Sequence, residues 1–384
     1  MWFSLFSTIL ILAVTFYQGL QGLFTGLINC ILAILSAAVA FGLYENVYFA
    51  FLVDRQPDYG RAIALVGIFV ITLLILRTLV DALIKRNVHF PLYVDRAGGG
   101  LFGFFTAMII VGMLCIGFQM LPFPPDFLGF KRFKVVNKEN GDEVPWRAAK
   151  KGEEPPLPTE DWSRLDLVRQ RTWLNPDGFT VSLVSHLSTN ALRGRDDITF
   201  SEIHPDFLTE TYAPKANPLG VSRLTAKPDS LQVVGVWDVP PNALLEREVI
   251  DRSGKKANKL KKAEAPGSDE KDIVIRVRLS DARDEGGQDV RFTPEVVRLF
   301  VREEEGRPMK VHHLWGINDD APGAANSLIR LYPGEPVARP DNTELDFVFR
   351  VPVSAALVFI QFKQDAPKEL RVSQAPAKKL WVPI

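Results

Sequence analysis

The first 122 residues contain too much continuous apolar sequence to form the core of a soluble domain. They include only six Lys or Arg residues and five Asp or Glu residues, and all the other charges of the 384-residue chain lie beyond them. A helix that crosses a bilayer needs about 20 predominantly apolar residues, and this stretch offers several such runs. We therefore expect an N-terminal membrane domain followed by a polar region.

Four apolar runs, separated by polar, glycine-rich or proline-containing breaks, predict four membrane-spanning helices. The break at Gln18–Gly22 is suited to a tight turn, but a helix that continued through it would leave only three spans. Tyr44–Leu52 has apolar residues at helical spacing, which predicts a short amphipathic helix on the membrane surface, with a longer second span as the alternative. The predicted spans are about residues 2–17, 22–44, 62–84 and 97–121.

Glycines cluster at two places in these apolar runs, and both clusters contain GxxxG spacing. In lipid no hydrophobic force drives helices together, so small residues that let two backbones approach become important. We expect packing within one bundle rather than a dedicated dimer face. The predicted packing residues are Gly19, Gly22 and Gly26 in the first cluster and Gly98, Gly99 and Gly103 in the second.

Arg77 and Asp81 are the ionisable pair that lies well inside an apolar run. Residues four apart share one face of a helix. A charge inside a bilayer is costly and suggests a functional site. An Arg near the end of a span can instead extend its guanidinium to the headgroups, and we favour this second interpretation because Lys85 follows only eight residues later.

Together these features resemble the colicin V production protein (CvpA) family. The resemblance rests on the glycines at the entry to the second span and on Asp95-Arg96-Ala97-Gly98-Gly99-Gly100-Leu101-Phe102-Gly103 at the start of the fourth. It covers about residues 2–122 and implies a bacterial inner-membrane protein linked to colicin V production or export, or to envelope maintenance. Family members usually end soon after the fourth helix, so the resemblance implies nothing about the remaining residues.

The rest of the chain divides by composition into three parts. Residues 123–161 predict an interfacial segment and a Pro- and charge-rich linker. Residues 162–229 predict a small helical region, in which Asn175-Pro176-Asp177 starts a helix and His204-Pro205-Asp206 forms a turn. Residues 230–384 alternate apolar and polar side chains in several short runs, which predicts an antiparallel β-sandwich with a weak likeness to immunoglobulin-like domains.

No sequence motif of a hydrolase, a nucleotide-binding loop, a metalloprotease or a dithiol centre occurs in the chain, so we expect a non-enzymatic protein without a cofactor or a metal. The net charge of zero gives no reason to expect a nucleic-acid partner. The expected partners are the lipid bilayer and other envelope or export proteins, and self-association stays open. The leading hypothesis is a scaffold of the cell envelope, and the alternative is a channel or transporter component that uses Arg77 and Asp81.

The side of the membrane that carries the polar region depends on the basic residues of the loops. Lys85, Arg86 and Arg96 flank the short third loop, and short loops weigh most in the positive-inside rule. Basic residues also follow the fourth span, but long domains cross membranes largely regardless of their charge. We therefore expect the third loop in the cytoplasm and the C-terminal domain outside it.

Overall fold

The computed structural model describes most of the chain and divides it into two compact units. The first unit comprises Met1–Arg132 and Gln170–Tyr212, and the second comprises Phe133–Arg169 and Ala213–Ile384. The described residues are 2–84, 90–124, 126–144, 162–189, 199–215, 225–239, 244–248, 259–282, 289–304, 308–318, 327–363 and 366–370.

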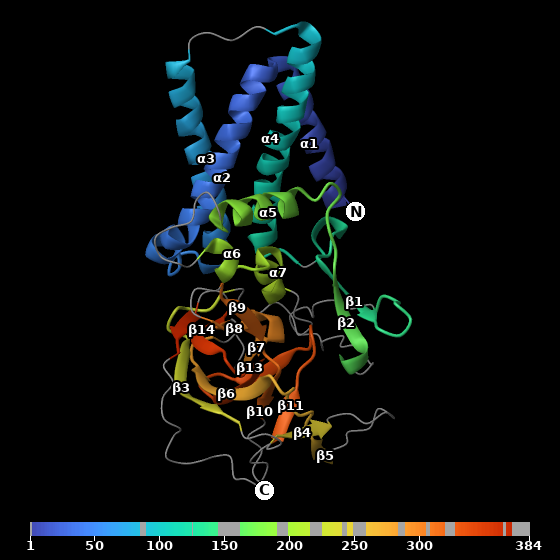
Figure 1. Cartoon of the computed structure of the whole chain (residues 1–384), viewed down its shortest axis with the longest axis vertical. Coiled ribbons are helices and arrows are strands. Elements are labelled where there is room, and N and C mark those ends of the chain that lie inside the picture. Colours follow the sequence, from blue (N-terminus) through green and yellow to red (C-terminus); the bar gives the residue numbers. More distant parts are fainter. Residues whose placement is uncertain are drawn as a thin grey trace. The chain divides into compact units, whose positions relative to one another are not determined.

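The first unit is built on four long apolar helices, each long and apolar enough to cross a membrane. The start of α1, the α2–α3 connection and the end of α4 lie at one end of this bundle, and the α1–α2 turn lies at the other (Figure 1). Gly22 separates the first two helices with a positive φ of 91°, so the prediction of four spans is correct. The four helices are α1 (Trp2–Gln21), α2 (Leu23–Val47), α3 (Pro57–Leu83) and α4 (Leu92–Met120).

The surface helix predicted over Tyr44–Leu52 is wrong, and the alternative of a longer second span is correct. A π-helical turn, η1 (Tyr48–Leu52), follows α2 without a break. Tyr44 and Tyr48 are fully buried, so this segment packs into the bundle instead of lying on the membrane. The helices α3 and α4 each begin five residues before the predicted limits, because Pro57 and Pro91 stand directly at the helix starts, and α1 continues to Gln21. Lys85 and Arg86 lie outside the described residues.

Three short helices complete the first unit and pack against one end of the bundle. Val184, Phe207 and Leu208 join the same apolar core as Phe41 and Ile116 of the long helices. The predicted helical region 162–229 is therefore divided between the two units. Residues Gln170–Tyr212 belong to the first unit, where their apolar side chains are buried against the membrane helices, and the rest of the region belongs to the second. These elements are α5 (Pro176–Thr189), α6 (Phe200–Ile203) and α7 (Phe207–Tyr212), preceded in the chain by the 3-10 turn η2 (Phe127–Gly129).

In its described residues, the second unit is built of β-strands with three 3-10 turns. Its sheets have the strand orders β1-β2, β3-β6-β13-β10-β11-β4-β5, β12-β7 and β15-β14-β8-β9. The strands are β1 (Phe133–Asn137), β2 (Leu165–Arg169), β3 (Leu231–Asp238), β4 (Leu245–Glu248), β5 (Lys259–Lys262), β6 (Glu270–Leu279), β7 (Asp289–Phe292), β8 (Val297–Arg302), β9 (Lys310–His313), β10 (Gly316–Asn318), β11 (Ser327–Arg330), β12 (Val337–Pro340), β13 (Glu344–Pro352), β14 (Ala356–Phe362) and β15 (Ala366–Glu369); the turns are η3 (Trp162–Arg164), η4 (Ala213–Lys215) and η5 (Pro294–Val296).

The alternating runs read from the sequence form the centre of this unit. Inward-facing residues of β6 and β13 share one core with residues of β8 and β14. Phe292 on β7 joins these layers through edge-to-face contacts with Phe347 and Phe362. The prediction of purely antiparallel pairing is wrong at one place, because β4 and β11 are parallel; the long stretch of chain between them permits this pairing. The immunoglobulin-like identity stays a prediction.

Candidate functional site in the membrane bundle

The predicted glycines lie where α4 crosses α1 and α2. A β-carbon added to Gly99 would lie 2.8 Å from the carbonyl carbon of Gly22, and one added to Gly26 would lie 3.2 Å from the α-carbon of Gly99. Real β-carbons essentially never make the first of these contacts. The two backbones therefore meet with no room for a side chain between them.

The remaining predicted glycines belong to the same crossing. A β-carbon on Gly19 would lie 3.6 Å from the α-carbon of Gly100, whereas Gly98 faces the side chain of Leu23 and Gly103 faces that of Gln18. Gly100 itself has nothing within 4 Å of an added β-carbon. The crossing therefore leaves no room for a side chain at Gly98, Gly99 or Gly103, but it leaves room at Gly100. The spacing in the sequence alone does not distinguish Gly100 from the other three.

Asp95 closes this crossing by capping a neighbouring helix. Its carboxylate accepts a hydrogen bond of 2.9 Å from the backbone N–H of Leu23, the first residue of α2. Gly22 is required beside it, because a β-carbon there would lie 2.5 Å from the Asp95 carboxylate and φ is positive. A free N–H at the start of a helix needs such an acceptor, and a negative charge also suits the helix dipole there. Asp95 therefore joins the start of α2 to α4.

Arg77 and Asp81 belong to a polar chain that connects three helices. Arg77 Nε donates to Asp81 Oδ2 over 3.0 Å, and Arg77 Nη1 donates to Asn29 Oδ1 over 2.5 Å. Asn29 Nδ2 in turn donates to Gln18 Oε1 over 2.8 Å. The chain therefore runs from α3 through α2 to α1, and Gln18 also packs against Gly103 of the glycine crossing.

This polar chain lies toward one end of the bundle. Gln18 is three residues from the end of α1, and Arg77 is six residues, or about 9 Å, from the end of α3. The side chains of Arg77 and Asp81 are 37% and 57% exposed, so the pair faces outward from α3. That position suits an Arg that extends toward the headgroups and also presents a charge pair to a neighbouring helix.

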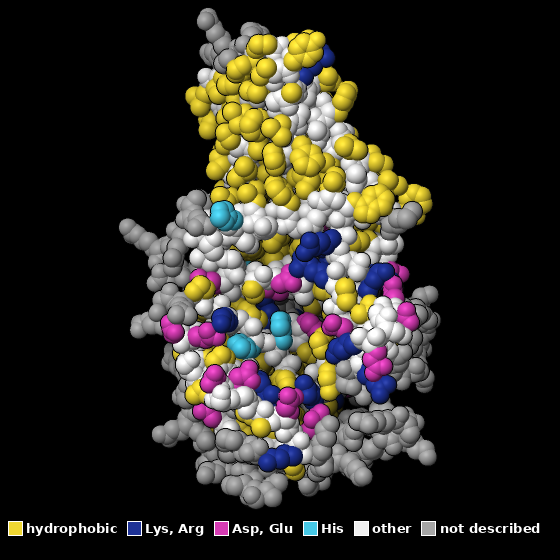
Figure 2. Space-filling model, turned by 45° about the vertical axis from the view of Figure 1, so that its right-hand side comes forward, with side chains coloured by type: hydrophobic (Ala, Val, Ile, Leu, Met, Phe, Trp, Pro, Cys, Tyr) yellow, Lys and Arg dark blue, Asp and Glu magenta, His cyan; other side chains and the backbone are white. Residues whose placement is uncertain are grey.

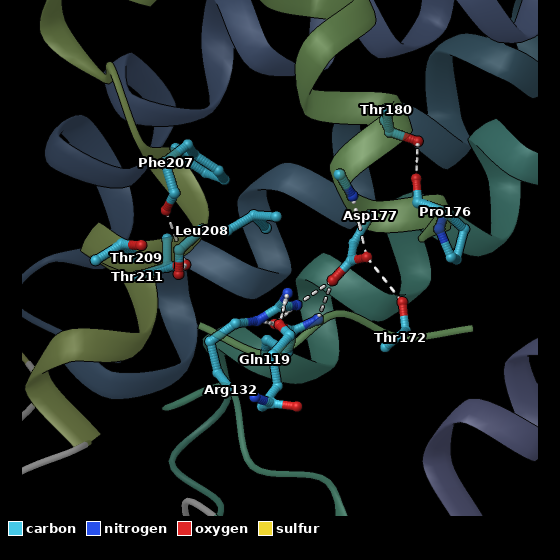
Figure 3. Close-up of polar contacts among 12 residues, drawn as sticks. Gln119, Arg132, Thr172, Pro176, Asp177, Thr180, Phe207, Leu208, Thr209 and Thr211 are labelled. Atoms are coloured by element: carbon cyan, nitrogen blue, oxygen red, sulfur yellow. Dashed lines mark hydrogen bonds and ion pairs between the residues drawn. The ribbon is translucent and has the colours of Figure 1, made fainter. Parts of the chain in front are cut away.

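A second polar cluster, buried at the opposite end of the bundle, was not predicted. Arg132 forms an ion pair with Asp177 at the start of α5, and both side chains are fully buried (Figure 3). Gln119 of α4 donates to Asp177 Oδ2 over 2.8 Å and accepts from Arg132 Nε over 3.1 Å. Thr172 donates to the other carboxylate oxygen over 3.0 Å. The cluster ties the end of α4 to α5.

The Asp177 carboxylate is held in its charged form despite its burial. Burial alone would raise the pKa of Asp177, but the charge of Arg132 and the hydrogen bonds from Gln119, Arg132 and Gly178 lower it below its usual value. Removing one partner would leave a buried charge uncompensated, which is strongly destabilising. We therefore interpret this cluster as structural, because it holds α5 against the end of α4.

Several of these residues left only partial signals in the sequence. Gln18 and Asn29 are polar residues inside or beside apolar runs, and their intramembrane pairing could have been suspected from that alone. Asp177 was predicted as a first-turn acid of its helix, but its pairing with Arg132 depends on residues 45 positions apart. Among the described residues, no group of three or more His, Cys, Asp or Glu side chains could hold a metal ion.

Comparison with known proteins identifies the membrane domain. Residues 7–132, about a third of the chain, are similar to the family model described as Colicin V production protein. The match ends at Arg132 and therefore includes the four long helices and one half of the buried ion pair. No curated protein and no solved structure gives a significant match to the chain.

Proposed function

We propose that this multi-pass membrane protein, which carries a colicin V production domain, is a non-enzymatic scaffold of the bacterial envelope. In this proposal the helical unit assembles with other membrane proteins, and the β-rich unit recruits envelope or export components. Its role would be in colicin V production or in maintenance of the envelope. The observation that carries the proposal is the outward-facing Arg77–Asp81 pair on α3.

The surroundings of this pair favour assembly over simple contact with lipid. Charged side chains within membrane helices almost always face a protein interior or a water-filled space. Arg77 bonds to Asn29 of α2, yet its side chain stays 37% exposed and that of Asp81 stays 57% exposed. Leu74, Ile75 and Leu79 around it are all more than half exposed. Hydrophobic side chains cover the visible face of the bundle (Figure 2). A partner helix with a polar group would satisfy the charge pair and cover these apolar neighbours.

A photo-crosslinking residue placed at Leu74, one turn before Arg77, tests this proposal in cells. We expect protein adducts at Leu74 that are lost when Arg77→Leu is added and are kept with Arg77→Lys. The same probe at Leu12, an equally exposed residue of α1, is the matched control. Adducts with a second copy of the chain would identify a homo-oligomer. Adducts with lipid alone at both positions would contradict the proposal.

The alternative is a channel or transporter component, and the observation in its favour is the polar chain across three helices. A path through the membrane would have to continue past this chain. The middle of the bundle is instead filled by apolar residues such as Ala37, Leu65, Phe69 and Met113. Ion flux through proteoliposomes that depends on Arg77 and Asp81 would favour this alternative over the scaffold.

The proposed location is the inner membrane, with the C-terminal unit outside the cytoplasm. The support is the short, basic α3–α4 connection, because Lys85, Arg86 and Arg96 are the type of residue that stays in the cytoplasm. The end of α4 lies at the opposite end of the bundle from the end of α3 (Figure 1). An alkaline phosphatase reporter fused after Ile384 should be active, and an inactive reporter together with an active cytoplasmic reporter would reverse the orientation.

A further inference from the structure

His204 lies between two carboxylates in the first unit. Its Nδ1 is 2.6 Å from Glu210 Oε2, and its Nε2 is 3.2 Å from Glu45 Oε1. The side chain of His204 is 1% exposed and that of Glu210 is 4% exposed, whereas that of Glu45 is 30% exposed. Phe41, Phe200 and Phe207 form an aromatic wall beside them.

This geometry requires an additional proton. A neutral imidazole has one N–H and one lone pair, so it can donate to only one of two carboxylates. The second carboxylate would then face the lone pair of the other nitrogen. With a proton on each nitrogen, the ring donates to both carboxylates, which are on opposite edges of the ring. The same opposed arrangement gives a metal ion no common point to bind.

We infer that His204, Glu45 and Glu210 form a proton-binding site that fastens the α6–α7 segment to the end of the second membrane span. The ligand of this site is the proton on the His204 ring, which lies between Glu45 of α2 and Glu210 of α7. When the proton leaves, either the buried Glu210 or the partly exposed Glu45 loses the imidazole as a donor, which costs free energy and loosens α6–α7 from α2. The π-helical turn directly after α2 marks this end of the span as irregular, as is common at functional sites.

The other charged groups around His204 do not replace this proton. Tyr44 donates to Glu45 Oε1 over 2.9 Å, and Arg61 of α3 lies beside Tyr48 and acts on Glu45 through its charge. Asp206 contacts Glu210 through its backbone N–H. Glu202 of α6 is buried, and its Oε2 has no hydrogen-bond partner in the described part of the chain. Carboxylates outnumber cations here, which favours an imidazolium at the centre.

The sign of the pH dependence follows from the surroundings of the ring. Burial by itself lowers the pKa of His204, but the charges of Glu45 and Glu210 and their hydrogen bonds raise it above its ordinary value. A group whose pKa is raised on folding stabilises the folded state below its unfolded pKa of about 6.5. That contribution is lost as the pH rises through the higher folded value. The segment is therefore held most strongly below about pH 6.5 and is loosened as the pH rises through the folded pKa of His204.

Histidine NMR on the full chain in nanodiscs tests the site, because the chain has five histidines and the His204 signal is identified by its loss in His204→Gln. We expect His204 to titrate above about pH 6.5, the ordinary value of a histidine. Glu210→Gln and Glu45→Gln keep a hydrogen-bonding side chain but remove the charge. Each should lower the midpoint of His204 by about one pH unit or more, a tenfold loss of proton affinity.

Thermal melting of the same samples measures how strongly the α6–α7 segment is held to α2. The melting temperature of the wild type should fall between about pH 6 and about pH 9, and Glu210→Gln should flatten this dependence. His186→Gln is the matched control and should leave it unchanged. Titration of His204 at or below about pH 6.5, a midpoint unaffected by both Gln variants, or an unchanged pH dependence of melting in Glu210→Gln would each overturn the inference.

Discussion

The membrane helices α3 and α4 are similar in length and in apolar character but differ in how they are packed. In their most apolar windows, 61% of the residues of α4 are buried, against 17% of those of α3. The window of α3 is the more apolar of the two, so hydropathy does not reveal which helix is central. The difference comes from glycines, which allow other backbones to approach α4 on several sides.

The neighbours of these glycines explain the contrast. Gly99 meets the backbone of Gly22 in the α1–α2 turn, Gly112 faces Pro176 and Thr180 of α5, and Gly117 faces Val66 of α3. The outer side of α3 instead presents large aliphatic residues and the Arg77–Asp81 pair. Changes on α4 should therefore affect folding, whereas changes on the outer side of α3 should affect assembly.

The largest expected effect is at the end of α4, where Gln119 and Arg132 hold Asp177. Arg132→Met leaves a buried carboxylate without its cation and should cost about 3–5 kcal/mol of unfolding free energy. Denaturant titration in detergent measures this cost. Lys134→Met is the control, because its pair with Glu143 has side chains 38% and 42% exposed and should contribute about 1 kcal/mol or less. Equal losses in the two variants would contradict a structural role for the buried Arg132–Asp177 pair.

The next largest effect is expected at the glycine crossing. Gly99→Ala places a β-carbon against the Gly22 backbone and should destabilise the bundle by about 1–3 kcal/mol, while Gly99→Leu should reduce the amount of folded protein in the membrane. Gly100→Ala is a matched control one residue away, where the added β-carbon meets nothing. Fluorescence-detected melting in detergent compares them. Equal melting of the two Ala variants would argue against close packing at Gly99.

A smaller effect is expected from the cap on α2. Asp95→Ala removes the acceptor of the Leu23 N–H and should cost about 0.5–2 kcal/mol. Asp95→Asn keeps an acceptor oxygen and should cost less, which separates the hydrogen bond from the charge. The same melting experiment gives both values. A larger loss in the Asn variant than in the Ala variant would mean that the carboxylate has another role.

The smallest effect on folding is expected on α3. Arg77→Lys and Arg77→Leu should each change the unfolding free energy by about 1 kcal/mol or less, because the side chains of the Arg77–Asp81 pair are 37% and 57% exposed. Arg77→Lys keeps a cation that reaches the headgroups, whereas Arg77→Leu removes it. Melting of the purified variants measures stability apart from any partner. A loss comparable to that of Gly99→Ala would show that α3 is as closely packed as α4.

The helices and strands could largely be predicted from the sequence because their signals are local. Apolar length determined the four spans, Gly22 separated the first two, and alternation at Ile273–Leu279 and Leu345–Val351 predicted β6 and β13. The pairing of Arg77 with Asp81 also follows from their spacing on one helix. The exact ends of the helices did not follow, since Tyr44 and Tyr48 extend α2 only because the bundle buries them.

The sequence by itself determined that this chain has a membrane domain similar to the colicin V production family and a β-rich region, because length, apolar content and glycine spacing are properties of neighbouring residues. Only the tertiary structure decided which polar residues meet. Asp95 caps a helix 72 residues earlier, Arg132 pairs with Asp177, and His204 lies 159 residues from Glu45. Such contacts depend on how helices cross in three dimensions, and no local pattern records that crossing.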